Sequence, residues 1–105
     1  LVVEDNPDQL RILTEMLRAA GYKVASSLGA EPGLRRAKSL KPDLILTDLA
    51  MPNMSGVQLI DALRSAPETS HIPIVAVTAY VWDGIAQAAG NAGADGFIAK
   101  PYTRA

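Results

Sequence analysis

Three carboxylates and one lysine stand directly after short apolar runs of this chain. Glu4 and Asp5 follow the first run, Asp48 follows a later one, and Lys100 follows the last. Grouped carboxylates offer the oxygen ligands that a hard cation prefers. An ammonium group beside them can neutralise an anion. These residue types therefore indicate chemistry at a charged group, provided that the fold brings the four side chains together.

The apolar runs alternate with helical patterns, which predicts a parallel sheet. We expect strands over residues 1–3, 22–26, 43–47, 72–77 and 96–99. Short apolar runs separated by helical stretches are typical of buried parallel strands. Parallel strands end at a common edge, where open α/β folds place their sites. The three carboxylates and the lysine are thus expected in a single pocket at that edge.

Apolar residues at helical spacing fill the segments between these strands. Asn6 and Pro7 suit the start of a helix that ends near Gly21, and further helices are expected over 30–40, after Gly56 and over 81–92. Strands alternating with helices predict an α/β fold, a doubly wound five-stranded parallel sheet flanked by helices. A last helix is expected to begin near residue 101 and to be truncated.

The overall composition is that of one globular domain. Its 105 residues are expected to form a single domain, 1–105, with both ends trimmed. A net charge of −1 argues against a nucleic-acid surface, and the lack of cysteine excludes disulfides and thiolate metal sites. No apolar stretch approaches the ~20 residues that span a bilayer. The composition is compatible with a cytoplasmic location.

Five short motifs carry a resemblance to a known family. They are VVEDN at 2–6, LTDLAMP at 46–52 with Gly56, VTA at 77–79, GADG at 93–96 and IAKP at 98–101. In this order and at these separations, the chain resembles the receiver domain of two-component response regulators over essentially its whole length. The resemblance implies the strand order 2-1-3-4-5.

The resemblance also implies a phosphoacceptor and a metal site. Asp48 is expected to accept a phosphoryl group, and Mg²⁺ is the expected cofactor. Asp5, Asp48 and the backbone carbonyl of Ala50 correspond to its direct ligands, and Glu4 is expected to act through a bound water. The cation would offset the repulsion between a carboxylate and an incoming phosphoryl group.

Further matching positions imply a switch. Lys100 is expected to pair with the phosphoryl group and Thr78 to donate its hydroxyl, while the backbone N–H groups of Ala50 and Ala79 complete the cradle. In the family, an aromatic residue three positions before the lysine then turns inward, and here that residue is Phe97. Pro101 matches the position of a cis prolyl bond that directs the lysine into the pocket.

The implied role is that of a signalling module rather than an enzyme, with at most slow self-dephosphorylation. The expected phosphoryl donor is a sensor histidine kinase or a histidine phosphotransfer protein. A downstream protein, an effector domain or a second copy of the chain are the expected further partners. The resemblance implies no direct contact with nucleic acid or membrane.

Other functions were weighed against this interpretation. A degenerate receiver that acts only as a docking module is disfavoured, because Asp5, Asp48, Thr78 and Lys100 are all intact. Toprim-like nucleases and haloacid-dehalogenase phosphatases need a second acid where Ala50 stands. Nucleotide and flavin sites are disfavoured because the chain has no G-x-x-x-x-G-K-[ST] loop and its first strand ends in acids.

Two stretches depart from the family pattern. Residues 82–92 carry Asp83 as their single charge, which favours a loosely specified helix over an apolar contact surface for a partner or second copy. Ala50 and Tyr80 occupy positions that flank the path of an attacking water. The alanine leaves room for water and the tyrosine obstructs or orients it, so their effects on the lifetime of the phosphorylated state oppose each other.

Overall fold

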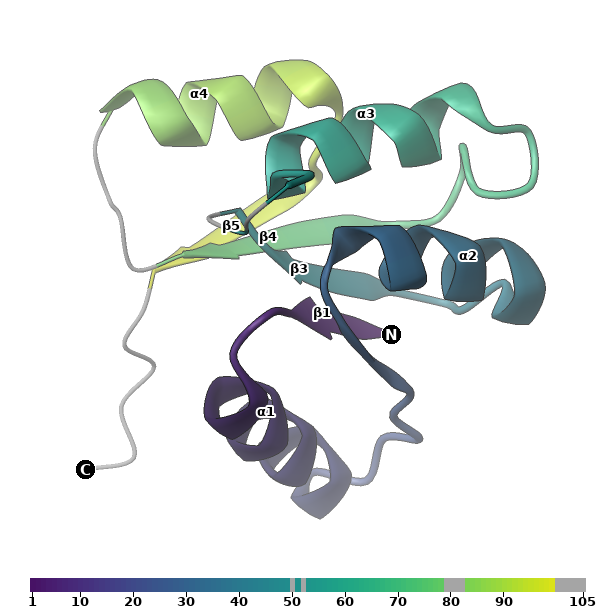
Figure 1. The fold of residues 1–105 in the computed structure, drawn as a ribbon, viewed down its shortest axis with the longest axis vertical. Coiled ribbons are helices and arrows are strands. Elements are labelled where there is room, and N and C mark those ends of the chain that lie inside the picture. The colour runs from purple at the N-terminus through teal and green to yellow at the C-terminus, as the bar shows by residue number, and fades with distance from the viewer. Residues whose placement is uncertain (50, 52, 79–82, 100–105) are drawn as a thin grey trace.

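Strands and helices alternate along the whole described chain. The computed structural model describes residues 1–49, 51, 53–78 and 83–99 (Figure 1). The elements are, in order, β1 (Val2–Glu4), α1 (Pro7–Ala19), β2 (Ser26–Leu28), α2 (Ala30–Leu40), β3 (Ile45–Asp48), α3 (Gly56–Ser65), β4 (Ile74–Thr78), α4 (Asp83–Ala92) and β5 (Gly96–Ala99). The expected start of a last helix lies outside the described residues.

The sheet has the predicted order. Its strands run parallel as β2-β1-β3-β4-β5, so each helix carries the chain back to begin the next strand. Helix α1 lies on one face of the sheet, and α2, α3 and α4 cover the other (Figure 1). The doubly wound α/β fold is confirmed, and all of its strands end at one edge.

Two apolar clusters, one on each face, hold the layers together. The larger joins the strands to the helices α2, α3 and α4 through Ala37, Leu59, Leu63 and Ala89. The smaller is formed by strand residues such as Leu46 together with the inner side of α1. Burying one such aliphatic side chain contributes about 1.5–3 kcal/mol, so the helix faces fix the strands below them.

The second strand is present as predicted, but its predicted bounds were wrong. Expected over 22–26, it lies instead at Ser26–Leu28, where it pairs with β1 in the register Val2 to Ser26. Because β1 begins at Val2, the first hydrogen bond between the two strands runs from the Val2 N–H to the Ala25 carbonyl, at 2.9 Å. Tyr22 lies before this pairing, and its side chain is 64% exposed.

Three other strands begin later than predicted. The first starts at Val2 and not at Leu1. The third starts at Ile45, whose N–H donates to the Pro73 carbonyl. The fourth starts at Ile74, because the Ile72 N–H is used in a turn with Thr69 and Pro73 has no N–H to donate. The helix over 30–40 has the predicted bounds. None of the described helices is long and apolar enough to cross a membrane.

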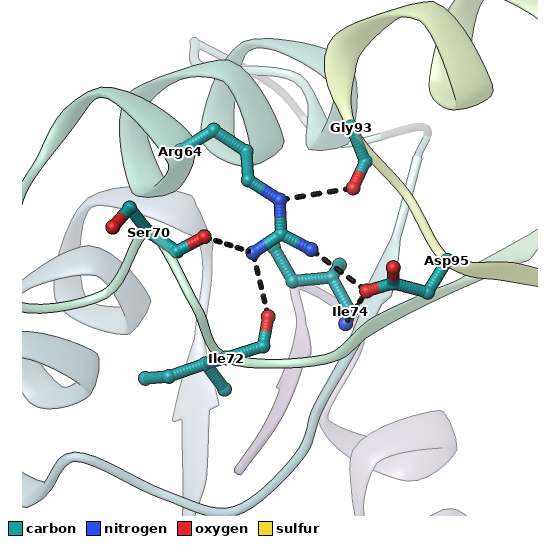
Figure 2. Close-up of polar contacts among 6 residues, drawn as sticks. All are labelled: Arg64, Ser70, Ile72, Ile74, Gly93 and Asp95. Carbon is teal, nitrogen blue, oxygen red and sulfur yellow. Dashed lines mark hydrogen bonds and ion pairs between the residues drawn. The ribbon is translucent and has the colours of Figure 1, made fainter.

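Arg64 joins the segments that meet at the amino edge of the sheet (Figure 2). Its guanidinium donates to the carbonyls of Ser70, Ile72 and Gly93 at 2.6 to 3.1 Å. It also pairs with the Asp95 carboxylate at 2.7 Å, and the same oxygen accepts the Ile74 N–H at 2.9 Å. The end of α3 is thereby tied to the starts of β4 and β5.

Candidate functional site

Glu4 and Asp5 lie where β1 ends at the carboxyl edge of the sheet. Glu4 is 3% exposed, and its Oε2 accepts the backbone N–H groups of Asp5 at 3.0 Å and Asn6 at 3.3 Å. Asp5 is exposed. The carboxylate of Glu4 is therefore fixed against the turn that follows the strand, and Asp5 projects at the rim.

The cap of α1 is Asn6 and not Asp5. The Asn6 Oδ1 accepts the N–H groups of Asp8 at 2.9 Å and Gln9 at 3.1 Å, which satisfies two donors at the helix start. Pro7 follows at the first helical position. Helix capping therefore does not account for the aspartate that precedes Asn6.

Asp48 is the last residue of β3 and is 8% exposed. It pairs with Val77 of β4, so its backbone belongs to the sheet. Gly56 at the start of α3 lies directly against it, and a Cβ at this glycine would overlap the Asp48 carbonyl oxygen. The main chain of Asp48 is thus enclosed between a neighbouring strand and the returning helix.

The three acidic side chains meet at this edge, as the sequence predicts. Ligand oxygens of Glu4, Asp5 and Asp48 all lie within 4.8 Å of one another. Carboxylates this close to one another repel, and a cation bound between them would offset the repulsion. An all-oxygen set of carboxylates matches what Mg²⁺ binds in proteins, so the donor chemistry fits the expected cofactor.

The remaining predicted residues are described only in part. Thr78 ends β4, which brings its backbone to the same edge as Asp48. Phe97 lies in β5 and is partly buried against the larger apolar cluster. Four others lie outside the described residues, namely Ala50, Ala79, Lys100 and Pro101.

Sequence reasoning missed one residue beside Asp48. Thr47 is fully buried, and its hydroxyl donates to the Asp48 carbonyl at 2.9 Å. The signal was a single hydroxyl within the otherwise apolar run that precedes Asp48. Gly56 was part of a motif, but only the structure shows that it is needed because α3 approaches the Asp48 backbone.

Comparison with known protein sequences matches this chain to response regulators. The model of the response regulator receiver domain matches residues 1–105. The polar-differentiation response regulator DivK of Brucella anthropi is 32% identical over 103 residues, which make up 98% of this chain and 84% of that protein.

Solved structures give the same picture. The chemotaxis protein CheY4 of Vibrio cholerae has a TM-score of 0.91 at 26% identity, over 97% of this chain and 85% of that one. The receiver domain of the sensor histidine kinase PA1611 from Pseudomonas aeruginosa has a TM-score of 0.89 at 31% identity, over 98% of this chain and 84% of that one. In that structure a magnesium ion is coordinated in the active site cleft.

Proposed function

This chain belongs to the response regulator receiver domain family of two-component signalling, and on that premise we propose that it is a phosphoacceptor whose acceptor is Asp48. The observation that carries the proposal is the convergence of Glu4, Asp5 and Asp48 within 4.8 Å at the carboxyl edge of the sheet. Fully matched family motifs surround this cluster in the sequence.

The proposed reaction is a single phosphoryl transfer. A carboxylate oxygen of Asp48 attacks the phosphorus of a phosphohistidine, the new P–O bond forms, and the P–N bond breaks. The imidazole nitrogen keeps the electron pair of the broken bond, and an acyl phosphate remains on Asp48. The departing imidazole carries a proton on its other ring nitrogen and leaves as the neutral ring, so no oxidant or further reactant is consumed. The work left to the protein is positioning and charge stabilisation.

Asp5 and Asp48, with the Ala50 carbonyl, would hold Mg²⁺ directly. When bound, the ion offsets the negative charge that develops on the phosphoryl oxygens. Glu4 would act through a bound water, because its Oε2 already accepts two backbone N–H groups and its side chain is buried. A carboxylate held in this way would orient the bound water and, through it, the ligands of the ion.

The switch that reports phosphorylation is proposed to include Thr78, Phe97, Lys100 and Pro101. Lys100 pairs with the phosphoryl group, Pro101 directs it, and Thr78 moves toward the new group. Phe97 then turns further into the protein. Its partly buried ring at the edge of the larger apolar cluster supports this step, since a rotamer change exchanges surface for core contacts.

The proposed partners follow from the family. Receiver domains of response regulators interact with histidine kinases and with downstream effectors. We propose a sensor histidine kinase or a histidine phosphotransfer protein as the donor for this chain, an effector protein, an effector domain or a second copy as the recipient, and the cytoplasm as the location. In this role the chain is a signalling domain and not an enzyme.

Intact-mass spectrometry tests the acceptor. The protein is incubated with Mg²⁺ and acetyl phosphate, beside Asp48→Asn and beside a sample with excess chelator. We expect one added phosphoryl group on the unaltered protein, none on Asp48→Asn and none without Mg²⁺. An adduct of equal yield on Asp48→Asn would overturn the assignment. A folded wild type that stays unmodified, also with a phosphohistidine donor, would favour a docking module.

A further inference from the structure

Thr47 is a polar residue in the most buried part of the sheet. Its side chain is 0% exposed, and it points with Val3 and Ala76, its register partners on the neighbouring strands, toward the larger apolar cluster. A hydroxyl placed there costs free energy unless it is hydrogen-bonded. Its partner is the carbonyl of the next residue, Asp48, at 2.9 Å.

This hydrogen bond lies where the pairing of β1 with β3 ends. The register between the two strands runs from Val2–Leu46 to Val3–Thr47 and goes no further. Beyond it the Asp5 N–H donates to the Glu4 carboxylate, and the Asp48 carbonyl accepts from Thr47. The Asp5 N–H and the Asp48 carbonyl are therefore each bonded to the side chain of the preceding residue. Asp5 and Asp48 part from the pairing of β1 with β3 at this point, and Asp48 stays paired with Val77 of β4.

The next carbonyl along the chain is also fixed. The Leu49 carbonyl accepts the Gly56 N–H at 2.9 Å, and the same glycine closes off the space beside the Asp48 carbonyl. Two consecutive peptide groups are thus held, one by Thr47 and the other by α3. Removing the Thr47 hydroxyl would take from this buried carbonyl the donor that it has in the structure, and would loosen the orientation of the Asp48 peptide.

We infer that Thr47 is a positioning residue, whose buried hydroxyl orients the Asp48 peptide so that the acceptor carboxylate and the main chain after it present their oxygens correctly to Mg²⁺ and to the phosphoryl donor. The inference rests on the proposed phosphoacceptor function. Thr47 is expected to contact neither the ion nor the phosphoryl donor. It is expected to act on both through the Asp48 peptide.

Thr47→Val removes the hydroxyl and keeps a β-branched side chain that suits a strand. Thr47→Ser keeps the hydroxyl and removes the methyl group. Thr69→Val is the matched control, because Thr69 is also 0% exposed and its hydroxyl donates to the Leu63 carbonyl at 2.7 Å, at the other end of α3. Urea titration at the assay temperature first establishes that every variant is folded.

On folded samples, the Kd for Mg²⁺ is measured by calorimetry and the rate of phosphorylation by acetyl phosphate is measured by intact mass. We expect Thr47→Val to weaken Mg²⁺ binding and slow phosphorylation by ~3- to 10-fold, the effect of one hydrogen bond. Thr47→Ser should recover most of both. Thr69→Val should lose stability and keep the wild-type Kd and rate.

Three outcomes would overturn the inference. Thr47→Val could show the wild-type Kd and rate, Thr69→Val could change them equally, or Thr47→Ser could fail to recover them. A wild-type protein that is never phosphorylated contradicts the proposed function instead, and the Mg²⁺ measurements on the same variants still decide whether the hydroxyl orients the carboxylate cluster.

Discussion

The two edges of the sheet are held by opposite means. At the amino edge a side chain does the work, because the Arg64 guanidinium bonds to three carbonyls and to Asp95 (Figure 2). At the carboxyl edge the main chain is fixed by its own neighbours, Thr47 and Gly56, while three carboxylates gather within 4.8 Å. Arg64 and Asp95 form an ion pair at the amino edge, whereas three acidic side chains gather at the carboxyl edge.

The difference distinguishes the Arg64 cluster, which stabilises the fold, from the carboxylate cluster, for which we propose a function. Pairing Arg64 with carbonyls and a carboxylate lowers the free energy of the folded chain by itself. Bringing Asp5 close to Asp48 adds a repulsion between two carboxylates, and a bound cation would offset that repulsion. The Asp48 backbone can carry this cost, because its carbonyl and the next one are held by Thr47 and Gly56 and not by the clustered carboxylates.

The largest effect is expected at the backbone of the carboxyl edge. Gly56→Ala places a Cβ on the Asp48 carbonyl oxygen and next to the Leu49 Cα, where neither group can move without disturbing the sheet. We expect a loss of about 3 kcal/mol or more in the free energy of unfolding, measured with urea. Gly90→Ala is the control.

Gly90 lies within α4 with open space around its Cα. Its replacement by alanine should raise the free energy of unfolding by about 0.5–1 kcal/mol. Equal effects of the two substitutions would show that the close approach at Gly56 is not needed, and the contrast between the edges would fail.

The next largest effect is expected at the amino edge. Arg64→Met keeps an aliphatic stem and removes every hydrogen bond of the guanidinium. We expect a loss of about 1–3 kcal/mol in the free energy of unfolding, since the partly buried carbonyls of Ile72 and Gly93 lose their donor, and the exposed Asp95 carboxylate loses its partner. Arg35→Met, on the exposed side of α2, should change it by no more than about 0.5 kcal/mol.

The phosphorylation rate of Arg64→Met tests whether the two edges of the sheet are independent. Below its unfolding transition, Arg64→Met should be phosphorylated by acetyl phosphate at the wild-type rate. A large loss of rate in a folded sample would contradict the assignment of the Arg64 cluster to structure alone, and would indicate coupling between the two edges.

The smallest effect, and one of opposite sign, is expected for Asp5→Asn. Without Mg²⁺ the variant should be more stable than wild type by about 0.5 kcal/mol, because one of three clustered charges is gone. Mg²⁺ at ten times its Kd should stabilise wild type by about 1.4 kcal/mol and the variant by much less. Thermal unfolding with and without Mg²⁺ measures both differences.

Asp8→Asn is the control for that experiment. Asp8 is an exposed acid in the first turn of α1, 3.9 Å from Arg11 and outside the carboxylate cluster. This variant should keep the full response to Mg²⁺. If Asp5→Asn keeps it as well, the cluster is not the site where the ion acts.

Most of the fold could be predicted because strand and helix patterns differ clearly here. Apolar runs that end at Glu4 and Asp48 marked two of the central strands, and the helix over 30–40 was placed with its correct bounds. The segment 22–26 was misplaced because its alternation is weak and its position is set by pairing with β1. Only the partner strand fixes where such an edge strand begins.

The site could be predicted as far as side-chain types mark it. Glu4 and Asp48 end their strands and Asp5 follows directly, so the topology alone brings the three together. The parts that could not be predicted involve backbone acceptors, which every residue carries. Nothing in the sequence indicates that Thr47 bonds to the carbonyl beside it, or that Arg64 selects the carbonyls of Ser70, Ile72 and Gly93.

The Arg64 cluster has a consequence for how the protein opens. All of its acceptors lie between residues 70 and 95, so the cluster closes one continuous stretch from α3 to β5. We expect this half to exchange its amide hydrogens as one cooperative unit. The amides of Ile74 and Asp95, which bond across the cluster at 2.9 and 2.7 Å, should then exchange at the same rate, and Arg64→Met should accelerate both together.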